Sequence, residues 1–224
     1  MAKPSTYTEL VTAVADYLHR SDLTSGFVDY FITEAEAEMN ARLRTRRQLT
    51  AITPTVSTAG VVTIPTTWAG WKRFTCRDGT NAWDLDILDV EQQYELDSEY
   101  GNTTGVPKAL LAGAGDHQIW PYTDATYTFR ALHYAVVPNL TSGASTNWLL
   151  TKHPTAYLYG CLAAARGYIV EDERLEKWQQ MFQHAMNRIE AEDALEMDSR
   201  DSVALTPNTN LFGNVWRANI TSDG

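Results

Sequence analysis

Cysteine is scarce in this sequence, and acidic residues outnumber basic ones. The 224-residue chain has two cysteines, Cys76 and Cys161, which lie far apart in segments with a buried pattern. This pair fits reduced core thiols and assembly in a cytoplasm, because a disulfide framework needs more cysteines. With 18 Lys and Arg against 28 Asp and Glu, the formal net charge is -10. That charge argues against tight nucleic-acid binding, although duplex DNA can pass a repelling surface without sticking.

Long apolar runs and catalytic signatures are also missing. No stretch approaches the roughly 20 apolar residues of a membrane span, and Met1–Pro4 leads into a polar helix start, so we expect a soluble chain without a membrane partner. The five histidines include no pair at the helical spacing of a zinc site. Nucleophile elbows, phosphate loops and Cys-His signatures are absent as well. We therefore predict no enzyme, no catalytic residue, no metal and no cofactor.

Helical patterns occupy both ends of the chain. Thr6 and Glu9 form a capping-box pattern before a first helix, and a second is predicted from Gly26 to Arg47 with acids early and arginines late. Pro154 begins a third helix, and a fourth carries a three-and-four apolar spacing. The predicted apolar faces are Val28, Ile32, Ala35, Met39 and Leu43, then Leu158, Cys161, Leu162, Ala165 and Ile169, then Leu175, Trp178, Phe182, Ala185 and Ile189.

Short β-type segments fill the middle of the chain. Turns are predicted at Thr58–Gly60, Asp78-Gly79 and Gly113–Gly115, with a short helix over 89–100 and a last strand over 126–136. The predicted fold class is α+β: an antiparallel helical bundle formed by the N- and C-terminal helices, with an inserted small antiparallel β-subdomain and an extended C-terminal arm. The expected boundaries are 5–47 and 152–197 for the discontinuous bundle, 49–150 for the β-subdomain and 198–224 for the arm.

The C-terminal segment is polar and aperiodic, yet it holds large apolar residues. Disordered tails are usually poor in such residues, so this tail either orders on a partner surface or folds back on its own chain. The anchors of the first alternative are Leu211, Phe212, Val215, Trp216 and Ile220.

One basic cluster and one acidic block stand out. Head-to-tail contacts between copies bring unlike patches together, so the two sets are hypothesised to meet across a subunit interface; the alternative is that they are solvated helix ends. The basic set is Arg42, Arg44, Arg46 and Arg47, and the acidic set is Glu190, Glu192, Asp193 and Glu196.

Four of the seven tryptophans concentrate in the β region. Exposed indole rings could stack on sugars, which gives an alternative function as a glycan-binding or tail-associated structural module. The commoner use of such residues is as buried or interface apolar area. The four are Trp68, Trp71, Trp83 and Trp120.

The order of elements resembles the head-to-tail adaptor, or connector, proteins of short-tailed bacteriophages. The likeness spans roughly residues 6–195 and rests on spacing patterns of structural residues. The segments that carry it are Tyr7–Val11, Phe31–Arg44, Ile64-Pro65, Gly105–Pro107, Trp120-Pro121, His133-Tyr134, Trp148–Leu150 and His153–Gly160.

This resemblance implies a structural virion protein located at the neck and tail. The implied assembly is a homo-oligomeric ring, commonly of twelve copies, beneath the portal protein and in contact with other tail or nozzle proteins. Double-stranded DNA passes through its channel during ejection without sequence-specific binding. The helices form the body of such a ring, the β-subdomain faces the tail, and the C-terminal arm contacts the portal.

Overall fold

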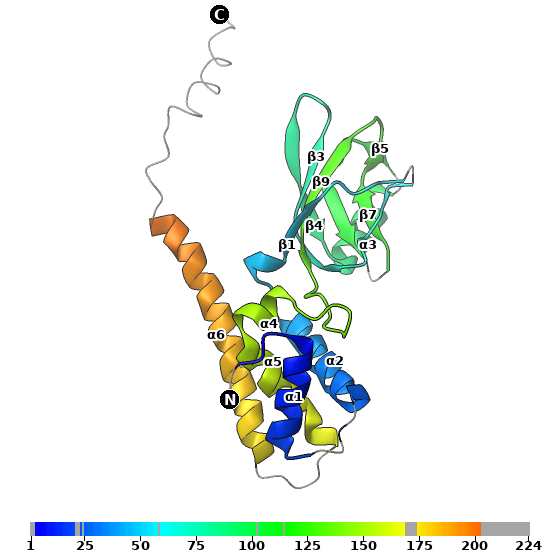
Figure 1. The fold of residues 1–224 in the computed structure, drawn as a ribbon. Coiled ribbons are helices and arrows are strands. Elements are labelled where there is room, and N and C mark those ends of the chain that lie inside the picture. The colour runs from blue at the N-terminus through cyan, green and yellow to red at the C-terminus, as the bar shows by residue number, and fades with distance from the viewer. Residues whose placement is uncertain are drawn as a thin grey trace, which may run out of the picture.

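The structure is a computed structural model that describes residues 3–20, 23, 25–57, 59–101, 103–113, 115–168 and 174–202. Helices and strands separate into two parts, seen in Figure 1 as a helical body below and a sheet above. We call Leu49–Ala135 the β unit and the helices on either side of it in sequence the helical unit.

The two N-terminal helices form as predicted at their starts and apolar faces. Helix α1 (Tyr7–Leu18) is capped by Thr6, whose hydroxyl accepts a hydrogen bond from the Glu9 amide at 3.3 Å. Helix α2 (Ser25–Arg42) buries its predicted apolar stripe from Val28 to Met39 at 2% exposure or less, and Leu43, the residue after the helix, is also fully buried.

The predicted end of the second helix at Arg47 was wrong. Helix α2 ends at Arg42, and Arg46–Gln48 form a separate 3-10 turn, η1. The Arg44 guanidinium donates to the carbonyl oxygens of Asn40 at 2.7 Å and Leu43 at 2.6 Å, which satisfies acceptors that the end of a helix leaves open. The basic cluster therefore lies mostly beyond the helix rather than in its last turns.

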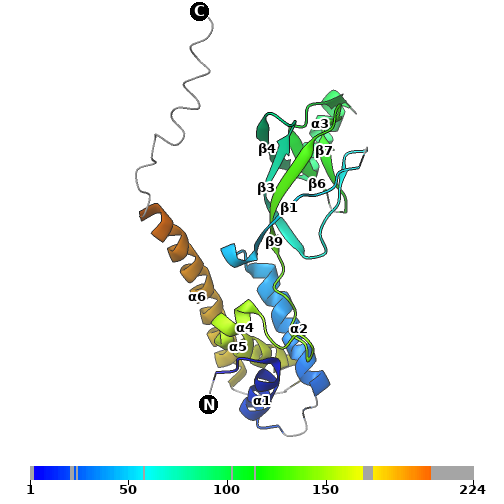
Figure 2. The ribbon, with the colours of Figure 1, turned by 45° about the horizontal axis from the view of Figure 1, so that its top comes forward.

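The C-terminal helices pack closely against α2. Pro154 opens α5 as predicted, and Gly160 of α5 lets three helices approach: a Cβ there would lie 3.0 Å from the Ala35 Cβ of α2 and 3.1 Å from the Phe182 Cε2 of α6. Figures 1 and 2 show α5 between α2 and the long α6. Helix α6 runs to Ser202, so its last residues fall in the predicted arm. The elements are α4 (Trp148–Lys152), α5 (Pro154–Ala164), η2 (Ala165–Gly167) and α6 (Arg174–Ser202).

The β unit is larger and less regular than predicted. Seven strands in the order β1-β9-β3-β4-β6-β7-β2 form a mixed sheet that curls into half a barrel. The strands are β1 (Leu49–Ile52), β2 (Val61–Val62), β3 (Trp68–Arg77), β4 (Ala82–Leu88), β6 (Ala109–Ala112), β7 (His117–Trp120) and β9 (Thr128–Ala135), and β5 (Thr104–Gly105) pairs separately with β8 (Tyr122–Thr123).

The expectation of a purely antiparallel sheet was wrong. Strands β4 and β6 pair in parallel, because helix α3 (Val90–Tyr100) carries the chain back before β6 begins. The hairpins around Asp78-Gly79 and 113–115 are confirmed by the β3–β4 and β6–β7 pairs. Around the predicted turn at 58–60, a single β-bridge joins Val56 to Val62. The flanking strands pair elsewhere, since Ile52 of β1 pairs with β9 and β2 pairs with β7.

Two apolar clusters fill the two units. The β cluster centres on Phe74, Cys76 and Leu110, each fully buried. The helical cluster includes Val137, Leu140, Leu149 and Leu150, so the chain joins the helical core soon after β9 ends, and the predicted boundary at 150 falls inside α4. Both cysteines are free, buried thiols. Among the described residues, no helix combines the length and apolarity that a bilayer crossing needs.

Candidate functional site

The basic cluster and the acidic block face one another within a single chain. Arg42 at the end of α2 reaches the side of α6, where its Nε and Nη2 donate to the Glu190 carboxylate at 2.7 and 3.0 Å. The same guanidinium donates to Gln183 at 2.6 Å and also to Asn187. These three partners lie one helical turn apart in sequence, so Arg42 ties α2 along two turns of α6.

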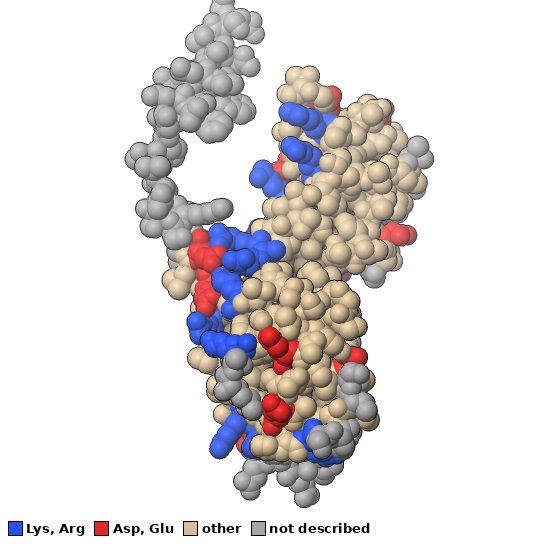
Figure 3. Space-filling view, viewed as in Figure 1, with Lys and Arg blue, Asp and Glu red and all other residues tan. Residues whose placement is uncertain are grey.

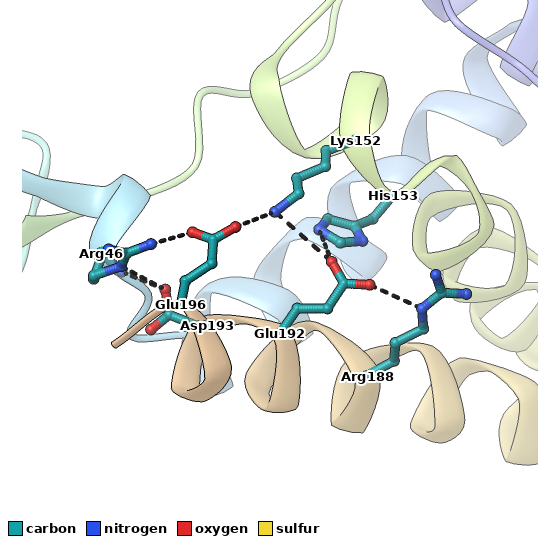
Figure 4. A network of polar contacts seen from close by, with 7 residues as sticks. All are labelled: Arg46, Lys152, His153, Arg188, Glu192, Asp193 and Glu196. Atoms are coloured by element: carbon teal, nitrogen blue, oxygen red, sulfur yellow. Dashed lines mark hydrogen bonds and ion pairs between the residues drawn. The ribbon is translucent and has the colours of Figure 1, made fainter. Parts of the chain in front are cut away.

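Arg46 extends these contacts toward the β unit, and we call the polar and charged contacts along α6 the seam. Its backbone amide donates to the Asp193 carboxylate at 3.0 Å, and its guanidinium pairs with Glu196. Figure 4 shows the remainder of the network around α6. Lys152 lies 3.0 Å from Glu196 and 3.7 Å from Glu192, which also receives a 2.9 Å bond from Arg188.

The ionisable groups of this seam are tuned by their neighbours. The hydrogen bond from Arg188 holds the pKa of Glu192 below its usual range, and Lys152 does the same for the pKa of Glu196. Burial lowers the pKa of His153, although the Glu192 carboxylate at 3.7 Å works in the opposite direction. A neutral imidazole therefore contacts Glu192 near neutral pH.

The other two arginines of the cluster differ from these. Besides its helix-end contacts, Arg44 donates to the Ala69 carbonyl of β3 at 3.2 Å, which links the helical unit to the sheet. Arg47 is exposed, and no hydrogen bond or ion pair joins it to a residue in the described ranges. The subunit contact hypothesised for these charges stays a prediction, and Arg42 and Arg46 already have partners in their own chain.

The predicted anchors of the arm lie outside the described residues. Leu211, Phe212, Val215, Trp216 and Ile220 all follow Ser202, where the described chain ends. Their role in binding a portal stays a prediction.

The sheet tryptophans are half-buried and hold contacts inside the β unit. Trp71 Nε1 donates to His117 Nδ1 at 2.5 Å. Trp68 packs edge-on against the same imidazole, with 4.9 Å between the ring centroids. Trp83 Nε1 donates to the Pro107 carbonyl at 2.8 Å. The side chains of Trp68, Trp71 and Trp83 thus contact neighbours within the β unit, and the glycan-binding alternative stays a prediction.

A buried polar cluster that the sequence analysis missed fixes the path of the chain back from the sheet. Glu36, 4% exposed, accepts hydrogen bonds from the Leu140 amide at 2.7 Å and the Tyr157 hydroxyl at 3.1 Å. Asn147 donates to Tyr157 at 2.6 Å, and Asn40 accepts from the Val137 amide at 2.7 Å. Burial raises the pKa of Glu36, against the effect of these hydrogen bonds. Its place beside the Ile32–Ala35–Met39 stripe was the available signal.

A second feature missed in the sequence is an arginine-lined groove on the outer face of the sheet. It has a volume of about 390 Å³ and lies across β1, β9, β3 and β4. The signal was the alternation of Arg73, Thr75 and Arg77 in β3, with Phe74 and Cys76 buried between them. The lining residues are Ala51, Arg73, Thr75, Arg77, Ala82, Thr128, Arg130, Ala131 and Leu132.

The described residues contain no cluster of three or more His, Cys, Asp or Glu side chains suited to a metal ion.

Comparison with known proteins gives one informative match. No curated protein matches the chain. The sequence model of the SU10 adaptor protein family matches residues 5–208, which covers both the helical unit and the β unit. A match over most of the chain, on an α+β fold whose conspicuous side chains are contact residues, settles the relationship: the chain belongs to the SU10 adaptor protein family of phage head-to-tail adaptors.

Proposed function

We propose that this chain is the subunit of a ring of twelve copies that joins the portal of a tailed phage to its tail. The family is one of structural phage adaptors, which implies a non-enzymatic role, a place in the virion and association with other virion proteins. The observation that carries the proposal is that the family match runs through both structural units.

The charge of the chain supports a place around a DNA exit channel. A net charge of -10 repels the phosphate backbone, so a duplex slides past the ring without being held by it. The packing of α2, α5 and α6 around Gly160 gives each subunit a dense body suited to a fixed position in the ring.

The arm is the proposed contact with the portal. The family match ends at residue 208, so the first eleven residues of the arm, 198–208, lie inside it and all five apolar anchors lie beyond it. Leu211, Phe212, Val215, Trp216 and Ile220 supply the apolar area of the arm.

The test is the mass of complexes formed with the portal protein encoded beside this chain. Three versions are compared: the full chain, a chain ending at Ser202, which keeps α6 whole, and a full-length chain with the five anchors changed to Ser. We expect a ring-sized complex with the portal to form only for the unaltered full-length chain, and not for either altered version. Association of all three versions would remove the arm from the proposal, and association of none would overturn the adaptor ring itself.

A further inference from the structure

The outer face of the sheet carries positive charge that has no ion-pair partner among the described residues. In the register of β3 and β9, Thr75 faces Arg130 and Arg77 faces Thr128, so Arg77 and Arg130 are diagonal neighbours on one face. Both side chains are exposed, and neither has an ion pair or hydrogen bond with any described residue. Figure 3 shows basic side chains gathered along the left flank of the β unit.

The third arginine of the groove is neutralised and serves as a contrast. Arg73 makes two hydrogen bonds to the Asp84 carboxylate, at 2.8 and 2.6 Å, and Thr75 donates to the same carboxylate at 2.9 Å. The groove floor between the arginines includes the small side chains of Ala51 and Ala82. The groove therefore combines two open cations with a shallow apolar floor.

An acidic segment that begins beside the groove and continues through α3 has the complementary character. The stretch from 78 to 107 holds eight acidic residues and no Lys or Arg. Within it, Glu91 and Glu95 are exposed and lie one turn apart on α3, with Tyr94 between them 73% exposed. The eight acids are Asp78, Asp84, Asp86, Asp89, Glu91, Glu95, Asp97 and Glu99.

The two surfaces belong to different parts of the sheet. Helix α3 packs against β6, and β3 and β4 separate β6 from β9 in the strand order. No residue of α3 lines the groove of its own chain, so a contact between the two surfaces calls for a second copy. A contact between two different patches of identical chains is head-to-tail, and repetition of it produces a ring when the rotation closes.

We propose that the arginine groove binds helix α3 of a second copy of this chain. Tyr94 of one copy enters the groove over the alanine floor, and Glu91 and Glu95 face Arg77 and Arg130 of the other. A large aromatic side chain flanked by charges at its rim is a common anchor of protein interfaces. This inference rests on the proposed function, because it names the surfaces through which subunits of one ring meet.

Duplex DNA is the competing occupant and fits the groove less well. Phosphate binding relies on many cations along a track, and here two unpaired arginines stand beside a thirty-residue acidic stretch in a chain of net charge -10. An acidic helix meets the same arginines with two carboxylates and adds apolar contact through Tyr94.

The experiment uses reciprocal charge reversal in the full chain, measured by sedimentation and native mass with and without the portal protein. One variant carries Arg77→Glu and Arg130→Glu, and the other carries Glu91→Lys and Glu95→Lys. A matched control carries Arg166→Glu and Lys177→Glu, two exposed cations of the helical unit. We expect each groove or α3 variant to weaken self-association at least about tenfold, the control to assemble as wild type, and an equal mixture of the two variants to recover association.

The outcomes separate this inference from the proposed function. A wild-type chain that stays monomeric alone and with the portal would overturn both. A wild-type chain that assembles while both variants assemble equally well would overturn the groove contact and leave the adaptor ring standing. If the Arg77 and Arg130 reversal abolishes binding to a 30-base-pair duplex at physiological salt and leaves self-association unchanged, the groove belongs to DNA instead.

Discussion

The helical unit and the β unit treat their charged residues differently. In the helical unit, Arg42 and Arg46 are bound by side chains of α6, and Glu36, a strongly buried carboxyl group, accepts two hydrogen bonds. In the β unit, Arg77, Arg130, Glu91 and Glu95 are exposed, and the two arginines have no partner among the described residues. Charged side chains that are paired within a chain stabilise its fold, whereas exposed charged side chains without a partner are available to bind another chain.

The largest expected effect comes from disturbing the helical core. Gly160→Val adds atoms where Ala35 and Phe182 already lie 3.0 and 3.1 Å from a Cβ position, so we expect a loss of about 3 kcal/mol in unfolding free energy. Denaturant unfolding measures it. Gly115→Ala is the control, because no atom lies within 4 Å of its Cβ position. A Gly160→Val chain as stable as the control would contradict the close packing of α5.

Glu36 gives the next effect. Glu36→Ala leaves the Leu140 amide and the Tyr157 hydroxyl without their acceptor, which we expect to cost about 2 kcal/mol in unfolding free energy. Thermal unfolding of the two chains, compared at one pH, measures this loss.

The same carboxyl predicts a pH dependence of known sign. Because the folded state raises the pKa of Glu36, its contribution to stability is complete below the unfolded pKa and is lost as pH rises through the folded pKa. Glu36→Gln keeps an acceptor and cannot ionise, so its stability relative to wild type should rise as pH increases above the unfolded pKa of a glutamate, about 4.3. Parallel pH curves for the two chains would exclude a raised pKa.

The charged seam along α6 should contribute less. Arg46→Ala removes the ion pairs of the guanidinium with the partly exposed carboxylates of Asp193, at 3.7 Å, and Glu196, and leaves the bond from the backbone amide to Asp193 in place. We expect a loss of about 1 kcal/mol in unfolding free energy. Arg47→Ala, which removes an exposed arginine without a described partner, should change it by less than about 0.5 kcal/mol. Equal losses from the two changes would mean that the seam does not stabilise the fold.

The smallest effect on stability is expected in the groove. Arg77→Ala and Arg130→Ala remove side chains that contact no described partner, so the unfolding free energy should stay within about 0.5 kcal/mol of wild type. Self-association should nevertheless weaken. A pair of substitutions that destabilises the fold as much as Arg46→Ala would erase the difference between the two units.

Local patterns in the sequence predicted the helices well. The apolar stripe from Val28 to Leu43 and the start of α5 at Pro154 follow from spacing and from the geometry of proline, which act over a few residues. The parallel pairing of β4 with β6 did not follow, because it depends on where the chain returns after α3. Likewise, the sequence shows that Arg42 and Glu190 have opposite charges. Only the fold shows that these residues, 148 positions apart, bind each other within one chain.

The candidate contact surfaces were less predictable for the same reason. Arg73 and Arg77 alternate visibly in one strand, but Arg130 joins them only through the register of β3 with β9. Glu36 is a single acid beside an apolar stripe, and its hydrogen-bond partners Leu140 and Tyr157 lie more than 100 residues away. Distant pairings of this kind leave no periodic trace.

The neighbouring positions of β1 and β9 bear on how this architecture can change over evolutionary time. Leu49, where the chain enters the sheet, is the register partner of Tyr134, where it leaves, and such partners are about 5 Å apart at their Cα atoms. The whole β unit is thus connected to the helical unit through two backbone segments that lie side by side. An exchange of this segment between viral genomes would need to match the backbone positions at these two connections. The surface presented to neighbouring proteins can then be replaced while the helices keep their packing.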